Sequence, residues 1–396
     1  MQKNPKSTTR IARGTAQILA LVRASMSSTS RIEDRYWEQN LQQTLQKLLA
    51  AGQDPAIEAA LETLCVNETE VADTLLEHAQ NASQTAMLTI DGQAWQCLLM
   101  TAPLAVWTRY QLPQAALNQQ AQEQLSKALR DTVLAPGVHV QLISQLLSLD
   151  EMPRSFGQIY QWQQQLGALA CGMRTEPPKP DKSENNPSLL ADTRHLVFAA
   201  LAPVDAPLFR WQADLRTTRQ GCLKDWIGQS QGALAALLPG CQFDILLPEA
   251  YHSSVQLSET HMRTVAIRSA CEWLQDTLGL AAGELRATLV AVGEHEPQEW
   301  RIGFHRGQSQ DVIYGTIWPL FEQQPSENLE HGIIDAGDEI AEVLKQNGVK
   351  HIKRIPGVFK PESCEDCEAP YFPNPTGELV HVELPEEAFD APMHFH

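Results

Sequence analysis

The segment from residue 173 to residue 190 constrains the fold more than any other part of the chain. It contains Pro177, Pro178, Pro180 and Pro187 among charged and polar neighbours, and its apolar residues follow neither a helical nor a strand pattern. A segment of this composition does not bury enough apolar surface to hold one conformation. We therefore predict a flexible linker over 173–190, with one folded unit of the 396-residue chain on each side of it.

The unit predicted before the linker, residues 30–172, begins with helical patterns and then changes to strand patterns. Ser30 and Glu33 have the spacing of a capping box that opens a helix, and leucines recur behind them as far as Gly52. Residues 1–29 form a basic, amphipathic helical pattern that we expect to pack on this unit. The other elements predicted here are helices near 55–65 and 68–80, a strand at 86–90, a tight turn at Asp91-Gly92, one or two strands over 95–107, and helices at 115–130 and 154–170.

The unit predicted after the linker, residues 191–360, mixes strands and helices. Its most informative part is a run of three strand patterns, 286–293, 299–305 and 311–318, with no helix between them, because such a run favours an antiparallel or mixed sheet. The predicted fold class is therefore α+β, with two α/β units and a small C-terminal tail, residues 361–396. The other elements predicted are strands at 195–201, 243–247 and 351–355, and helices within 219–238, at 264–278 and at 337–346.

Charge and hydropathy exclude two classes of protein. The net charge is −18, from 30 Lys and Arg against 48 Asp and Glu, so extensive binding to nucleic-acid phosphates is not expected. The apolar stretches are much shorter than the roughly 18–20 residues that cross a bilayer. The short apolar run at 16–22 is followed at once by Arg23 and does not resemble an export signal, so we expect a cytoplasmic protein.

The charge is unevenly distributed along the chain. Residues 1–32 contain basic residues and no acidic ones, whereas the tail contains acidic residues and no Lys or Arg. The two ends are either solvated surfaces or sites that recruit a protein partner, and the sequence does not predict the oligomeric state.

The strongest chemical motif is Cys364-Glu365-Asp366-Cys367 in the tail. Two thiolates separated by two residues can chelate one metal ion from a tight turn, and tetrahedral zinc then needs two further ligands. His381, His394 and His396 follow, so we predict a structural zinc site made by Cys364, Cys367, His381 and a terminal histidine, His396. Metal binding would supply folding energy to a tail too polar to form a core.

Two other interpretations of this motif stay open. The two cysteines are plain surface thiols, or they carry redox chemistry. The redox interpretation is the weaker of these, because prolines follow the motif instead of a helix and four surrounding acidic residues disfavour a thiolate. Position 368 is Glu, where a metal-binding turn often has Gly, and a left-handed Glu costs on the order of 1 kcal/mol.

Other patterns are less specific. Gly228–Gly232 matches G-x-S-x-G, but it lacks a buried strand before the serine, so we interpret it as a polar helix or loop. Arg301, His305 and Arg306 form a local basic patch that could meet an anionic ligand or the acidic tail. We find no Walker A loop, G-x-G-x-x-G, H-E-x-x-H or EF-hand pattern.

Several motifs together resemble an uncharacterised betaproteobacterial family, the domain of unknown function 2863, over nearly the full length. The resemblance implies a bacterial cytoplasmic protein and brings no activity, substrate or catalytic residue. In that family Gly usually follows the second cysteine, so Glu368 departs from the pattern. The residues that carry the resemblance are Ser30–Glu38, Pro153–Phe156, Ala206–Trp211, Leu238–Cys241, Leu247–His252, Tyr314–Leu320 and Cys364–Pro375.

The function that these observations favour is regulatory or interaction-based, with structural zinc in the tail. The alternative is an enzyme that acts on a small anionic substrate in a cleft between the two units, near His252, Arg301 or His305. A third possibility is an open three-ligand zinc site, in which His394 and His396 do not bind and a water completes the shell.

Overall fold

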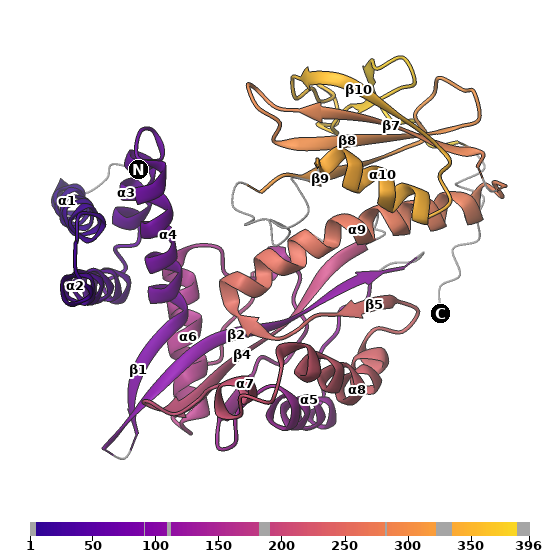
Figure 1. The fold of residues 1–396 in the computed structure, drawn as a ribbon. Coiled ribbons are helices and arrows are strands. Elements are labelled where there is room, and N and C mark those ends of the chain that lie inside the picture. Colours follow the sequence, from indigo (N-terminus) through magenta and orange to yellow (C-terminus); the bar gives the residue numbers. More distant parts are fainter. Residues whose placement is uncertain are drawn as a thin grey trace.

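The computed structural model describes residues 5–90, 92–108, 112–181, 191–281, 283–321 and 335–385. Its first part is a group of four helices, α1 (Pro5–Met26), α2 (Arg31–Ala50), α3 (Pro55–Cys65) and α4 (Thr69–Gln84) (Figure 1). The predicted cap is present, because the Ser30 hydroxyl accepts a hydrogen bond from the Glu33 amide at 3.3 Å. Ile18 and Val22 of α1 are fully buried against leucines of α2 and α3, so the N-terminal helix packs on its neighbours as expected.

A six-stranded antiparallel sheet follows, with β2 (Gln93–Trp107) at its centre. Along one edge of β2 lie β1 (Thr85–Ile90), then β6 (Glu249–Ala250), then β5 (Gln242–Ile245). Along its other edge lies β4 (Ala191–Pro203), which in turn pairs with β3 (His139–Leu142). Helices α5 (Gln119–Thr132) and α8 (Arg219–Leu237) cover one face, and α6 (Phe156–Ala170) lies on the other.

This sheet takes strands from both sides of residues 173–190: β1, β2 and β3 come before them, and β4, β5 and β6 come after them. Strand β4 follows that segment and pairs with β2 over the full length of β4. The part of the segment that is described, 173–181, contains neither helix nor strand. The composition of the segment did not indicate that strands on its two sides pair in a single sheet.

The second sheet has the order β10-β7-β8-β9. Strands β7 (Leu285–Val292), β8 (Glu299–Arg306) and β9 (Tyr314–Pro319) form an antiparallel meander, while β10 (His351–Phe359) pairs with β7 in parallel. Helices α9 (Tyr251–Thr277) and α10 (Ala336–Gln346) cover one face, where their apolar residues pack on Trp300, Ile302 and Phe304. The molecule is therefore α+β, with antiparallel and mixed sheets as the sequence predicted.

The C-terminal segment covers the opposite face of this sheet. Strand β11 (Phe372–Pro373) pairs with β12 (Leu379–Val380), and β11 lies over two glycines that face each other on β8 and β9. A Cβ on Gly315 would lie 2.3 Å from the Phe372 ring, and a Cβ on Gly303 would lie 2.1 Å from the Pro373 carbonyl oxygen. The tail thus packs closely on the sheet and buries Phe372 and Asn374, instead of standing apart as a polar appendage.

We expect Gly303→Ala to destabilise the protein by about 1–3 kcal/mol, because the new methyl group would overlap backbone atoms of the tail. Gly232→Ala is the matched control: Gly232 lies in α8 with open space around it, so alanine should leave stability unchanged or raise it by up to about 1 kcal/mol. Urea unfolding of the two variants measures both effects. Equal stability of Gly303→Ala and the unmodified protein would contradict the close packing of the tail.

Candidate metal centre

The two motif cysteines lie in a short hairpin, which we call the knuckle (residues 362–371). Its strands meet at a bridge between Ser363 and Pro370, and the Cys364 amide donates to the Ala369 carbonyl at 2.9 Å. The Glu368 amide donates to the Cys364 carbonyl at 2.9 Å, which turns the chain back on itself. Glu368 has a φ of 59°, so the left-handed residue predicted at the position after Cys367 is present.

The knuckle brings three of the predicted ligands together. The side-chain ligand atoms of Cys364, Cys367 and His381 lie within 4.8 Å of one another, and Cys367 Sγ is 3.2 Å from His381 Nε2. A tetrahedral zinc ion with Zn–S near 2.3 Å and Zn–N near 2.0 Å separates its ligand atoms by roughly 3.5–4 Å, so small side-chain adjustments complete the geometry. His381 reaches the knuckle because it directly follows β12.

The imidazole of His381 is held in the orientation that metal binding requires. Its Nδ1–H donates to the Val382 carbonyl oxygen at 2.8 Å, which leaves the lone pair of Nε2 directed at Cys367. A hydrogen bond from the second ring nitrogen to a carbonyl is the usual way in which proteins fix the tautomer of a metal-binding histidine. Cys364 is half-buried, whereas Cys367 and His381 are exposed.

The remaining predicted ligand, His396, and its alternative, His394, lie outside the described residues. The other cysteines do not contribute to this cluster. All eight are unpaired thiols. Of the six outside the motif, Cys97, Cys222 and Cys271 are buried, Cys171 and Cys241 are half-buried, and Cys65 is exposed. The Tyr371 ring also lies beside the site, with its centroid 6.4 Å from that of His381. Desolvation first and the adjacent Cys364 thiol second raise the pKa of the Tyr371 hydroxyl.

The predicted basic patch is partly buried under the tail. Arg301 and His305 are each only 5% exposed. The Arg301 guanidinium contacts the knuckle through backbone carbonyls, not through the acidic side chains that the charge pattern suggested. The His305 Nε2 lies 3.2 Å from the Thr288 hydroxyl on the neighbouring strand, and burial lowers the pKa of His305 to about 4.

The G-x-S-x-G pattern falls inside helix α8. Ser230 is fully buried, and its hydroxyl donates to the Trp226 carbonyl one turn earlier at 2.7 Å. This is the polar helix that the sequence favoured over a catalytic turn. At the start of α9, Tyr251 donates to the Pro153 carbonyl at 2.8 Å, and His252 contacts the buried Ser83 hydroxyl at 3.0 Å.

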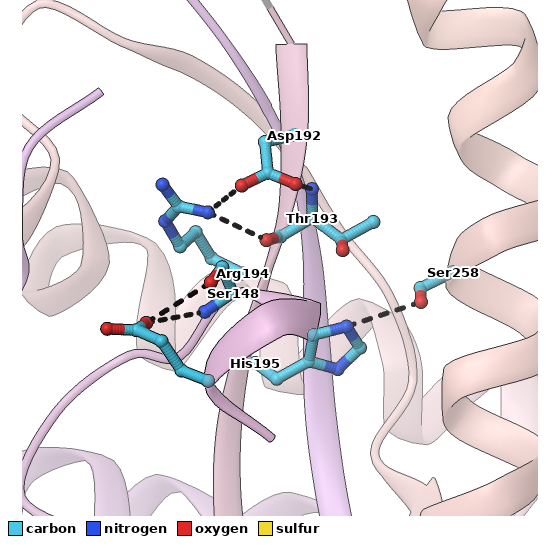
Figure 2. A network of polar contacts seen from close by, with 7 residues as sticks. Ser148, Asp192, Thr193, Arg194, His195 and Ser258 are labelled. Atoms are coloured by element: carbon cyan, nitrogen blue, oxygen red, sulfur yellow. Dashed lines mark hydrogen bonds and ion pairs between the residues drawn. The ribbon is translucent and has the colours of Figure 1, made fainter. Parts of the chain in front are cut away.

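A buried histidine that the sequence did not single out lies between β4 and α9. Figure 2 shows the His195 imidazole directed at Ser258 of α9, while Arg194 and Asp192 contact each other on the other side of the strand. Ser258 donates its hydroxyl proton to the Val255 carbonyl at 2.7 Å, so His195 Nε2–H donates to the Ser258 oxygen and Nδ1 accepts from Thr101. His195 is therefore a satisfied core residue, and it does not act as a base toward Ser258.

A separate groove of about 1510 Å³ lies between α2 and the first sheet. Amide side chains of α2, including Gln39, Gln42 and Gln46, line it together with the apolar Met87 and Leu98. None of its lining residues is Lys or Arg, and neither His252, Arg301 nor His305 lines it. The groove is therefore separate from the residues near which the alternative hypothesis placed its substrate.

Fold and site together define the class: an α+β protein with a Cys2His group suited to a metal ion in its C-terminal segment. A family model described as protein of unknown function (DUF2863) matches residues 3–395, and the chain therefore belongs to that family. This confirms the resemblance to the domain of unknown function 2863. No curated protein and no solved structure matches the chain. Within the described residues, the helices are too short or too polar to cross a membrane.

Stability should fall as the pH is lowered from about 6.5 toward 4. Burial lowers the pKa of His195 to about 3 and that of His252 to about 4, whereas an unfolded histidine titrates near 6.5. Between the folded and the unfolded pKa of each histidine, the unfolded chain binds more protons than the folded protein. Each histidine therefore reduces the free energy of unfolding by up to about 1.4 kcal/mol for each unit by which the pH is lowered.

Urea unfolding at a series of pH values measures this dependence. His252→Gln should reduce the slope between pH 6.5 and 4, while His295→Gln, at an exposed loop position, should leave it unchanged. If His252→Gln and the unmodified protein give the same slope, His252 is not held neutral by the fold.

Proposed function

We propose that this protein binds one structural zinc ion at Cys364, Cys367 and His381, and that it works through interactions with other molecules and not as an enzyme. The observation that carries the proposal is the convergence of three ligand atoms within 4.8 Å on a tight turn. The fixed His381 tautomer supports it, because Nε2 is left free to bind a metal.

The ligand set favours zinc over other common ions. Two thiolates and one imidazole suit borderline-soft cations, whereas magnesium and calcium prefer oxygen ligands. We propose that His396 is the fourth ligand, which would close the shell and leave no position for a substrate.

The interaction role rests on where the site lies. Cys367 and His381 are exposed, so a metal here would bind at a surface hairpin and contribute little to the cores of the two sheets. The acidic knuckle would then present a rigid surface to a protein partner. A reducing cytoplasm is part of this proposal, because it keeps the two thiols available for metal binding.

Metal analysis of the purified full chain tests the proposal. We expect about one zinc per chain in the unmodified protein and a background level in a double variant, Cys364→Ser with Cys367→Ser. Cys65→Ser is the matched control, because Cys65 is an exposed thiol on α3, outside the ligand group, and its loss should not change the zinc content. His396→Ala should weaken zinc binding if this residue closes the shell.

Equal zinc content in the double variant and the unmodified protein would refute the metal site. The interaction role is tested by comparing the proteins that co-purify with the unmodified chain and with the double variant. An identical set from both would contradict a role for the metal-bound knuckle in partner binding.

A further inference from the structure

We propose that Arg301 is a positioning residue for the metal centre, and that it holds the knuckle in its metal-binding shape before any metal binds. The inference rests on the proposed zinc site and adds how that site is built. It also reverses the order expected from the sequence, in which the metal gives shape to an otherwise unstructured tail.

The guanidinium of Arg301 joins both strands of the knuckle at their base. Its Nη1 donates to the Glu362 carbonyl at 2.6 Å and to the Tyr371 carbonyl at 2.8 Å. The same two residues also pair with each other, because the Tyr371 amide donates to the Glu362 carbonyl at 3.1 Å. Glu362 precedes the first cysteine and Tyr371 follows the second, so these bonds fix the separation of the two chain segments that carry the thiols.

Arg301 itself has little freedom to move. Its Nε donates to a Glu299 carboxylate oxygen at 2.7 Å, and the side chain is 6% exposed. Its backbone belongs to β8, which is paired on both sides, with β7 and β9. Hydrogen bonds from a charged donor are roughly twice as strong as neutral ones, so this arrangement holds the knuckle firmly to the sheet.

The imidazole side of the site is anchored on the same sheet. Phe372 and Pro373 of β11 lie over Gly315 and Gly303, and Phe372 pairs with Val380, next to His381. Beyond His381, the Glu383 amide donates to the Val312 carbonyl at 2.9 Å. Both arms of the centre, the thiols and the imidazole, are therefore positioned by contacts that do not involve a metal, and binding need not order them.

Arg301→Lys is the informative substitution, because lysine keeps the positive charge but lacks the planar fork that contacts Glu299 and both carbonyls. We expect its zinc affinity to be 10–100-fold weaker, the range typical for loss of a residue that orients metal ligands. Arg286→Lys is the matched control. Arg286 lies on the same face of the neighbouring strand, opposite His305, and this variant should bind zinc like the unmodified protein.

Zinc affinity is measured on the full chain by competition with a chromophoric chelator, and the thermal unfolding midpoint is recorded in parallel. A drop in affinity with an unchanged midpoint supports positioning, which a general loss of stability would not reproduce. If Arg301→Lys does not fold, Glu299→Gln serves instead, because it removes only the carboxylate that orients the guanidinium, and a smaller loss of affinity is expected. Unchanged affinity in the folded variant overturns the proposal.

Hydrogen exchange of the metal-free protein separates this inference from the zinc proposal. The amides of Cys364, Glu368 and Tyr371 should be protected in the unmodified protein treated with chelator and should exchange faster in Arg301→Lys. Rapid exchange of these amides in the metal-free unmodified protein overturns the role of Arg301, even if zinc binds. Protection without any zinc binding supports the Arg301 contacts and refutes the zinc site alone.

Discussion

The two sheets of this protein are held together by the packing of one helix, α9, and the rest of the fold depends on it. The helix has 27 residues and is therefore about 40 Å long. Its first half packs on β2 and β4 with Tyr251, Ser254 and Ser258, and its second half packs on the other sheet with Ile267 and Leu274. Because α9 packs on two sheets, it buries different faces along its length, and some of the residues that it buries are polar.

The number of partners that an element packs on explains how well it was predicted from the sequence. Helices with a single apolar stripe, such as α10, and strands bounded by turns, such as β7 and β8, were predicted within a few residues. For α9 only residues 264–278 were predicted, because its first half buries serines against β2 and the buried His195 where an apolar stripe would be expected. The division at 173–190 was predicted from composition, which carries no information about which strands pair across the segment.

The candidate site likewise depends on residues that are close in the sequence and on residues that are distant from them. Cys364 and Cys367 are recognisable because a chelating pair needs only a short turn, and His381 because it follows closely in the chain. The surface that receives the tail is built from Arg301, Gly303 and Gly315, whose significance appears only once β8 and β9 lie side by side beneath β11. An arginine in a strand predicts a basic patch. It does not reveal that the Arg301 guanidinium donates hydrogen bonds to main-chain carbonyls of the knuckle.

The pairing of β2 has a consequence for how the chain is made. Helices α1–α4 have a core of their own and can fold as soon as they leave the ribosome. Strand β2 emerges soon afterwards with only β1 beside it, while β4, β5 and β6 are still untranslated. The edge of β2 that pairs with β4 therefore stays open until β4 has been made, and during this interval the unpaired strand edge leaves the nascent chain prone to aggregation.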